Sequence, residues 1–227
     1  HDGIASGRAS IKGEDGPLSL DAKVPLGVVA DTSVIVQAPY RLLASGCADV
    51  ISNSTAVKDW EFARKLRGEE FSRSAYSLAV YTAETIIDNA DIIKPNQEES
   101  VWVAIRPIII SGISMSVAGS SRPTSGSEHM FSHAMDRICP GRGLHGEQCG
   151  IGAIMMMYLH GGDWKRIRDA LIKIGAPTSA KELGIPSEKI IEALVTAHKV
   201  RSRFTILGQE GLTYEAAEHL ATITKVI

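Results

Sequence analysis

The sequence has few cysteines, few aromatic side chains and no surplus of either charge. Its three cysteines, Cys47, Cys139 and Cys149, include no CxxC pair. A disulfide framework or a cysteine-rich zinc site is therefore not expected, and a reducing cytoplasm is the expected location. Lysine and arginine number 24 and aspartate and glutamate 26, a net charge of −2. Without a basic surplus, we expect a small-molecule partner rather than nucleic acid or an anionic membrane surface.

The sequence also lacks a long uninterrupted apolar run. The longest run, VWVAIRPIIISGISMSVAG at 101–119, contains Arg106 and Pro107, which are unfavourable in a helix that spans lipid. GIGAIMMMYL at 150–159 is too short to span. We therefore predict no membrane span, and no signal peptide is visible. Because the chain opens on His1 without a methionine, we expect an upstream part to be missing.

What the chain does contain falls into two regions. Residues 1–38 are rich in glycine and in short β-type runs. One of these runs, PLGVVAD at 25–31, predicts a buried strand that ends at an aspartate. So few strands cannot form a stable sheet alone. We interpret residues 1–38 as the end of an α/β domain whose beginning is absent.

From about residue 39 the apolar spacing becomes helical, and the connections are short, as in a helical bundle. Ser187 and Thr213 are candidate N-caps, and Gly161 with Gly162 is a candidate helix stop. We therefore predict an all-α bundle over 39–227. The helical spacing covers 40–66, 73–93, 97–118, 127–138, 146–160, 163–174, 187–199 and 213–225.

Three of the seven histidines lie close together in the sequence. Ser125 and Glu128 match a capping box, which predicts a helix that carries His129 and His133 on one face. His145 opens the next helix, and a short antiparallel connection brings it back towards His129. The order differs from the HExxH motif, because Glu128 precedes the first histidine. The cluster is either part of a metal site or a pair of ordinary helices that carry imidazoles.

A metal site would need a further ligand, and catalytic zinc commonly takes two imidazoles and a carboxylate. Asp49 is the candidate, because an aspartate on an apolar helical run is costly unless it is paired or metal-bound. Alternatively, Asp49 caps a helix after Gly46, or it pairs with Asn53. Cys149 is a candidate fourth ligand, although a lone helical cysteine is more often a small core residue.

Five segments together resemble the sn-glycerol-1-phosphate dehydrogenases. These enzymes belong to the superfamily of iron-containing alcohol dehydrogenases, glycerol dehydrogenases and dehydroquinate synthases. The resemblance implies that residues 1–38 are the C-terminal remnant of a Rossmann-like nucleotide-binding domain, followed by the helical metal- and substrate-binding domain at 39–227. The segments are HDGIASGRAS (1–10), ASGCADVISNSTAVKDW (44–60), SGSEHMFSHAMD (125–136), GLHGEQCGIG (143–152) and KVRSRFTIL (199–207).

The resemblance also implies roles for single residues. The metal ligands of the family correspond to Asp49, His129 and His145. Asp2, Asp49 and His133 correspond to residues that contact substrate, and Asp49 and His133 are the expected catalytic residues. His133 is expected to hydrogen-bond a substrate hydroxyl or to relay a proton.

Cofactor and phosphate contacts are less completely defined. Ser6 corresponds to a serine of the family that contacts the nicotinamide cofactor. For the substrate phosphate, the sequence offers Arg122, Lys58 and Arg142 as cations without ranking them. The basic turn at 197–203 is expected to be a solvated face.

The family reaction is the reduction of dihydroxyacetone phosphate by NAD(P)H, which gives the sn-glycerol 1-phosphate of archaeal membrane phospholipids. The expected cofactors are NAD or NADP and a divalent metal. The expected metal is Zn²⁺, and aspartate and histidine ligands also accept Ni²⁺ or Fe²⁺. One alternative is an alcohol dehydrogenase of the superfamily that acts on an unphosphorylated substrate. Another is a non-catalytic helical metal-binding fragment. The sequence leaves homo-oligomerisation open.

Overall fold

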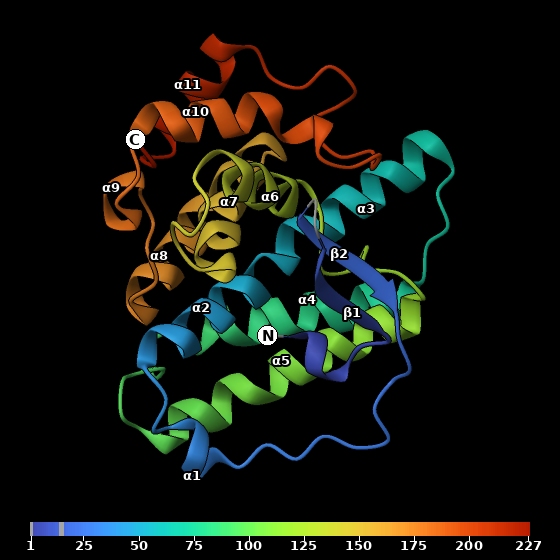
Figure 1. Cartoon of the computed structure of the whole chain (residues 1–227), viewed down its shortest axis with the longest axis vertical. Coiled ribbons are helices and arrows are strands. Elements are labelled where there is room, and N and C mark those ends of the chain that lie inside the picture. The colour runs from blue at the N-terminus through green and yellow to red at the C-terminus, as the bar shows by residue number, and fades with distance from the viewer. Residues whose placement is uncertain (1, 14–15) are drawn as a thin grey trace.

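The region from residue 39 onward is almost entirely helical in the computed structural model (Figure 1). The structure describes the backbone of residues 2–13 and 16–227 and the side chains of 3–7 and 20–227. The all-α part of the predicted fold is confirmed. The helices are α2 Tyr40–Ile51, α3 Asn53–Arg67, α4 Arg73–Asp88, α5 Glu98–Ala118, α6 Ser127–Ile138, α7 His145–Leu159, α8 Trp164–Ile174, α9 Ala180–Leu183, α10 Ser187–Thr196, η2 Ala197–Lys199 and α11 Tyr214–Ile223.

The single helix predicted over 40–66 is wrong, because two helices, α2 and α3, meet at Ser52. The Ser52 hydroxyl donates to the carbonyl of Asp49 (2.7 Å), and the Ser54 hydroxyl donates to the carbonyl of Ile51 (2.7 Å). Hydroxyls that bond to backbone carbonyls in this way compete with the helical ladder. The junction therefore falls in a cluster of side-chain hydroxyls.

The predicted helix ends are partly right. Thr213 caps α11, since its hydroxyl accepts from the backbone N–H of Ala216. Gly161 has φ +65° directly after α7, as expected of a helix stop. The Ser187 prediction is wrong: α10 begins at Ser187, and Pro186 occupies the capping position without a side-chain bond.

Before residue 39 the described chain forms η1 Asp2–Ala5, an antiparallel hairpin of β1 Arg8–Gly13 and β2 Gly16–Asp21, and the short helix α1 Thr32–Ile35. The strand predicted at 25–31 is wrong: this segment has no regular structure, and Leu26 and Val29 are exposed. Asp31 does not end a strand, because its carboxylate accepts from Ser33 N and Val34 N and caps α1. The Rossmann-like remnant and the domain boundary after residue 38 stay predictions.

The centre of the molecule is built from α2, α6 and α7, with α10 packed on α6 (Figure 1). Where α7 begins it comes very close to α2. A Cβ on Gly146 would lie 1.9 Å from the carbonyl oxygen of Ser45, so no larger residue fits there without a backbone shift. This approach brings the C-terminal half of α2 against the start of α7.

One helix, α5, is long and apolar enough to cross a membrane by length and composition alone. It packs against α4, α2 and η1, and Pro107 lies buried inside it. The guanidinium of Arg106 lies over the ring of Trp102, 4.9 Å from its centroid. The helix is thus partly buried: Val101, Ala104 and Ile108 are buried, whereas Trp102 is 49% exposed.

Candidate metal centre

Three residues that are far apart in the sequence come together at the centre of the bundle. Asp49 lies in α2, His129 in the first turn of α6, and His145 is the first residue of α7. Oδ1 of Asp49 is 3.6 Å from Nε2 of His129 and 3.7 Å from Nε2 of His145. Asp49 therefore does not cap a helix, because it lies within the last turns of α2 and is buried.

This arrangement fits a divalent metal. The ligand atoms of the three residues and of Cys149 all lie within 4.8 Å of one another. Two ligands of a tetrahedral zinc ion at bond lengths of about 2.0–2.1 Å lie about 3.4 Å apart, close to the observed separations. One carboxylate and two imidazoles are also a donor set that Zn²⁺, Ni²⁺ and Fe²⁺ accept.

His129 is oriented by the residue before it. Glu128 is fully buried, and its Oε1 lies 2.9 Å from Nδ1 of His129. A carboxylate only accepts, so Nδ1 carries the proton and Nε2 is left as the donor atom for a metal. Glu128 also accepts from Gly126 N (2.6 Å) and from the hydroxyl of Thr55 (2.9 Å). The predicted capping box with Ser125 is therefore wrong, since α6 begins at Ser127 and Glu128 bonds to Gly126.

His145 is oriented through a hydroxyl. The Ser132 hydroxyl donates to Oε1 of Gln148 (2.6 Å), whose amide nitrogen donates to Oδ1 of Asp136 (3.1 Å) and to the carbonyl of Arg142 (2.9 Å). Because its one proton is used, the Ser132 oxygen must accept from Nδ1 of His145 at 3.0 Å. Nε2 of His145 is therefore again the atom left for a metal. Burial lowers the pKa of His145, which keeps its ring neutral at pH 7.

Another buried carboxylate, that of Asp59, joins the helices that carry the histidines. Its Oδ2 accepts from the backbone N–H and the hydroxyl of Ser127, at 2.7 and 2.6 Å, where α6 begins. Its Oδ1 accepts from Ile206 N (2.7 Å) and lies 3.1 Å from Nε2 of His160, at the end of α7. No sequence motif indicated Asp59, because it contacts partners that are distant along the chain.

The fourth member of the cluster, Cys149, is buried one helical turn after His145. Its Sγ lies 3.5 Å from Nε2 of His145. Burial, followed by the carboxylates of Asp49 and Glu128, raises the pKa of Cys149 well above its usual value. In the metal-free protein the group is therefore a neutral thiol.

His133 lies beside the cluster, with its ring centroid 6.4 Å from that of His129 and 5.8 Å from that of His145. Nη2 of Arg201 is 3.1 Å from its Nε2. A guanidinium only donates, so Nε2 of His133 accepts and Nδ1 carries the proton. Burial, and then the charge of Arg201, lowers the pKa of His133 to about 3.

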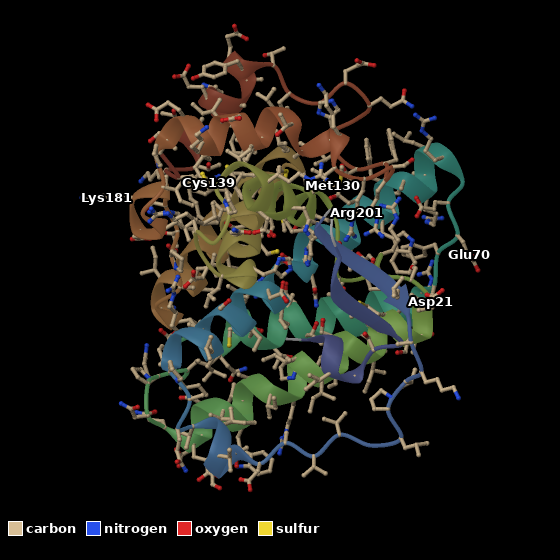
Figure 2. The ribbon with its side chains drawn as sticks, viewed as in Figure 1. Asp21, Glu70, Met130, Cys139, Lys181 and Arg201 are labelled. Carbon is tan, nitrogen blue, oxygen red and sulfur yellow. The ribbon has the colours of Figure 1, made fainter. Side chains whose placement is uncertain are left out.

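The prediction of a solvated basic face at 197–203 is therefore wrong for two arginines. Arg201 is half-buried beside α6 (Figure 2). Arg203 donates to the carbonyl of Ser125 and to the hydroxyl of Ser121. Both lie in the segment that follows η2, which packs on α6.

Solved structures show that this architecture is known. The chain superimposes on glycerol dehydrogenase from Schizosaccharomyces pombe with a TM-score of 0.74 at 20% identity, over 98% of this chain and 60% of that one. An iron-containing alcohol dehydrogenase from Thermococcus thioreducens gives a TM-score of 0.63 at 14% identity, over 98% and 61%. At these identities the likeness shows the fold alone.

Curated relatives are far more similar. The glycerol-1-phosphate dehydrogenase [NAD(P)+] of Methanothermobacter thermautotrophicus is 61% identical over all of this chain and 66% of its own length. The enzyme of the same name from Methanosarcina mazei is 59% identical, over all of this chain and 64% of its own length. The chain belongs to the glycerol-1-phosphate dehydrogenase family.

A family profile described as "Iron-containing alcohol dehydrogenase" also matches residues 1–39 of this chain. The chain spans between 61% and 66% of the length of the first curated relatives it matches. The likeness to these relatives thus covers 97–100% of this chain and only part of theirs.

The remaining predicted site residues are Ser6, Asp2 and the three candidate cations for the substrate phosphate. Ser6 is buried, and its hydroxyl donates to the carbonyl of Gly3 (3.3 Å), near α5. The side chain of Asp2 lies outside the described residues. Arg122 is buried and pairs with both carboxylate oxygens of Glu69. Arg142 is exposed, and Lys58 is half-buried.

Proposed function

We propose that this chain is the metal- and substrate-binding part of an NAD(P)-dependent glycerol-1-phosphate dehydrogenase. The enzyme would reduce dihydroxyacetone phosphate to sn-glycerol 1-phosphate, the backbone of archaeal membrane phospholipids, in the cytoplasm. The convergence of Asp49, His129 and His145 carries this proposal. The names of relatives at 59–61% identity support its substrate and cofactor.

We also propose that residues 1–38 close a Rossmann-like nucleotide-binding domain and that residues 39–227 form the metal- and substrate-binding domain. The profile match at 1–39 supports this division, as does the fraction of the relatives' length that the chain spans. In this proposal Ser6 contacts the nicotinamide cofactor, which supplies the hydride. Ser6 lies in the N-terminal region, as this role requires.

Asp49, His129 and His145 would hold the metal, for which we propose Zn²⁺, with Ni²⁺ or Fe²⁺ as substitutes. A divalent cation held there supplies the positive field that polarises the ketone and stabilises charge on its oxygen. Glu128 and Ser132 keep the two imidazoles neutral and turned, so that each presents its Nε2.

His133 would act as a hydrogen-bond donor to a substrate oxygen. Its Nε2 already accepts from Arg201, and its pKa of about 3 keeps the ring neutral. A neutral ring of this kind donates through Nδ1–H and is a poor store for a proton at pH 7. Of the two roles expected from the sequence, donation to a substrate hydroxyl is therefore the one we propose. Asp2 would hold a further hydroxyl.

The test follows NAD(P)H oxidation by the full-length protein with dihydroxyacetone phosphate and with dihydroxyacetone, before and after chelation. Turnover of the phosphate ester that is lost on chelation and restored by Zn²⁺ is expected. Single changes Asp49→Asn, His129→Ala and His145→Ala should each abolish metal binding and turnover. His219→Ala, at an exposed histidine of α11, is the matched control and should keep both. Turnover of dihydroxyacetone alone would overturn the proposed substrate.

A further inference from the structure

The first turn of α6, which carries His129, is capped by side chains other than that of its own capping residue. Gly126 occupies the capping position, and α6 begins at Ser127. The first backbone N–H groups of a helix have no partners within the helix. Here two fully buried carboxylates accept from them: Glu128 from Gly126 N at 2.6 Å, and Asp59 from Ser127 N at 2.7 Å. Glu128 belongs to α6 itself, whereas Asp59 reaches it from α3, 68 residues earlier in the chain.

Helix α3 comes so close to the start of α6 that only glycine fits at position 126 (Figure 1). A Cβ on Gly126 would lie 2.6 Å from Oδ2 of Asp59 and 2.9 Å from Cα of Ala56. Because this Cα belongs to the backbone of a packed helix, it cannot yield unless α3 moves. The hydroxyl of Ser127 adds a second bond to Oδ2 of Asp59, at 2.6 Å. The carboxylate therefore fixes where the first turn of α6 lies on α3.

The other oxygen of Asp59 holds two further segments. Oδ1 accepts from Ile206 N at 2.7 Å, in the segment after η2, and lies 3.1 Å from Nε2 of His160, which directly follows α7. A carboxylate only accepts, so Nε2 of His160 carries the proton. One side chain of α3 thus joins the start of α6, the end of α7 and the segment after η2.

These contacts require a carboxylate. The described hydrogen-bond partners of Asp59 are all donors: two backbone N–H groups, one hydroxyl and one imidazole N–H. Asparagine has nearly the same shape, but one end of its amide is an NH₂ group that only donates. Whichever way that amide is turned, its nitrogen would face the backbone N–H of either Ser127 or Ile206. A buried donor that faces another donor loses its hydrogen bond and stays desolvated.

We propose that Asp59 is a positioning residue of the metal centre, which holds the first turn of α6 where His129 meets Asp49. This inference rests on the proposed function, because it takes Asp49, His129 and His145 as the metal ligands. His129 is two residues after Ser127, so a shift of this turn moves the imidazole with it. Metal–ligand distances tolerate only about 0.2 Å of variation. A small displacement of the turn is therefore enough to weaken metal binding.

This role differs from that of Glu128. Glu128 contacts Nδ1 of His129 directly and sets its tautomer, whereas Asp59 bonds to the backbone and sets the position of the turn. Removing the Asp59 carboxylate should therefore weaken metal binding without changing the tautomer of His129. In the ¹⁵N spectrum of the metal-free Asp59→Asn variant, His129 should still be protonated at Nδ1.

The experiment compares Asp59→Asn and Ser127→Ala with wild type in the full-length protein, prepared free of metal. Zinc affinity is measured by competition with a zinc-binding dye. For Asp59→Asn the affinity should fall by roughly 10- to 100-fold. Ser127→Ala removes one of the bonds and keeps both backbone donors, so a loss of roughly 2- to 10-fold is expected. The double variant should bind zinc about as weakly as Asp59→Asn alone, because the hydroxyl acts through Asp59.

Thr82→Val is the matched control. Thr82 is as deeply buried as Asp59, and its hydroxyl accepts from Nδ2 of Asn53 at 3.0 Å, which joins α4 to the start of α3 away from α6. Both Asp59→Asn and Thr82→Val should lower the urea midpoint of unfolding. Only Asp59→Asn should lower the zinc affinity and change the visible absorption spectrum of the Co²⁺-loaded protein.

The outcomes separate this inference from the function on which it rests. A wild type that binds no zinc would overturn the proposed metal centre and the Asp59 assignment together. A wild type that binds zinc, with an Asp59→Asn variant that binds it equally tightly, would overturn the assignment alone. If Asp59→Asn does not fold, an unaltered zinc affinity in Ser127→Ala overturns the assignment. Equal losses of zinc affinity in Asp59→Asn and Thr82→Val would show that affinity follows stability in general, and would also overturn it.

Discussion

Oε1 of Glu128 lies 2.9 Å from Nδ1 of His129, the next residue in the chain. Neighbouring side chains on a helix do not normally face each other. Here they meet because Glu128 is in the first turn of α6 and turns inward to accept from Gly126 N and from Thr55. This contact fixes which nitrogen of His129 is available to a metal, and the hydroxyl of Ser132 does the same for His145.

Ser132→Ala should weaken metal binding by roughly 10- to 100-fold, because His145 loses the acceptor that fixes its tautomer. The affinity is measured on the metal-free protein by competition with a zinc-binding dye. In addition, the ¹⁵N spectrum of the metal-free wild type should show His145 protonated at Nδ1, and the variant should show a mixture of tautomers.

The matched control is Ser114→Ala. Ser114 is as deeply buried as Ser132 and is also helical, but its hydroxyl donates only within its own helix in the described contacts, to the carbonyl of Ser111 at 2.7 Å. This change should leave the zinc affinity unaltered. Equal affinities for Ser132→Ala and wild type would refute the orienting role of Ser132.

Gly146→Ala should separate α2 from α7. The new Cβ would lie 1.9 Å from the carbonyl oxygen of Ser45. Because this oxygen belongs to the backbone of a packed helix, the clash can be relieved only if the helix moves. We expect a loss of about 3 kcal/mol in the free energy of unfolding, measured with urea. We also expect weaker zinc binding, because Asp49 and His145 lie on the two helices that are pushed apart.

Gly46→Ala is the control for this change. Gly46 is in α2 as well, but its new Cβ would meet only the end of the Ile108 side chain, at 3.4 Å. Alanine also favours a helix over glycine by roughly 1 kcal/mol, so the variant should be at least as stable as wild type. If both glycine variants unfold alike, the close approach at Gly146 is not what limits stability.

The helical spacing alone placed His129, His133 and His145 on adjacent helices, and the structure confirms their proximity. The apolar context of Asp49 made it a candidate ligand, but the choice between a ligand and a helix cap came from the family resemblance, since no local pattern reports a contact between distant helices. Asp59 was missed for the same physical reason, because it contacts segments far along the chain. Such polar contacts leave no periodicity in the sequence.

At 25–31 the local pattern is present, but the contact that a strand needs is absent from the described chain. The apolar residues of this segment have the local pattern of a buried strand, but a strand also needs a neighbour to accept its backbone hydrogen bonds. In the described chain β1 and β2 pair with each other, and 25–31 remains exposed. Local preference therefore predicted the helical bundle well and the N-terminal region poorly.

The low pKa of His133 makes stability depend on pH. The unfolded chain binds a proton at His133 below about pH 6.5, whereas the folded chain does so only near pH 3. Stability is therefore lost as pH falls through this window. His133→Gln keeps an acceptor for Arg201 without titrating, so between pH 7 and 5 the metal-free variant should lose about 2 kcal/mol less than wild type. Urea unfolding at both pH values measures the difference, and parallel losses would contradict it.

The three thiols should differ sharply in reactivity. Burial raises the pKa of Cys47 to about 12 and that of Cys149 well above its usual value, whereas Cys139 is half-buried at the end of α6. Because the thiolate is the reactive form, a thiol-specific dye at about pH 8 should label one cysteine in the native protein and three after denaturation. Cys139→Ser should remove the native labelling altogether. Rapid labelling of a second thiol in the metal-free native protein would show that the α2–α7 contact opens, and that the ligand cluster is not held in place by the fold.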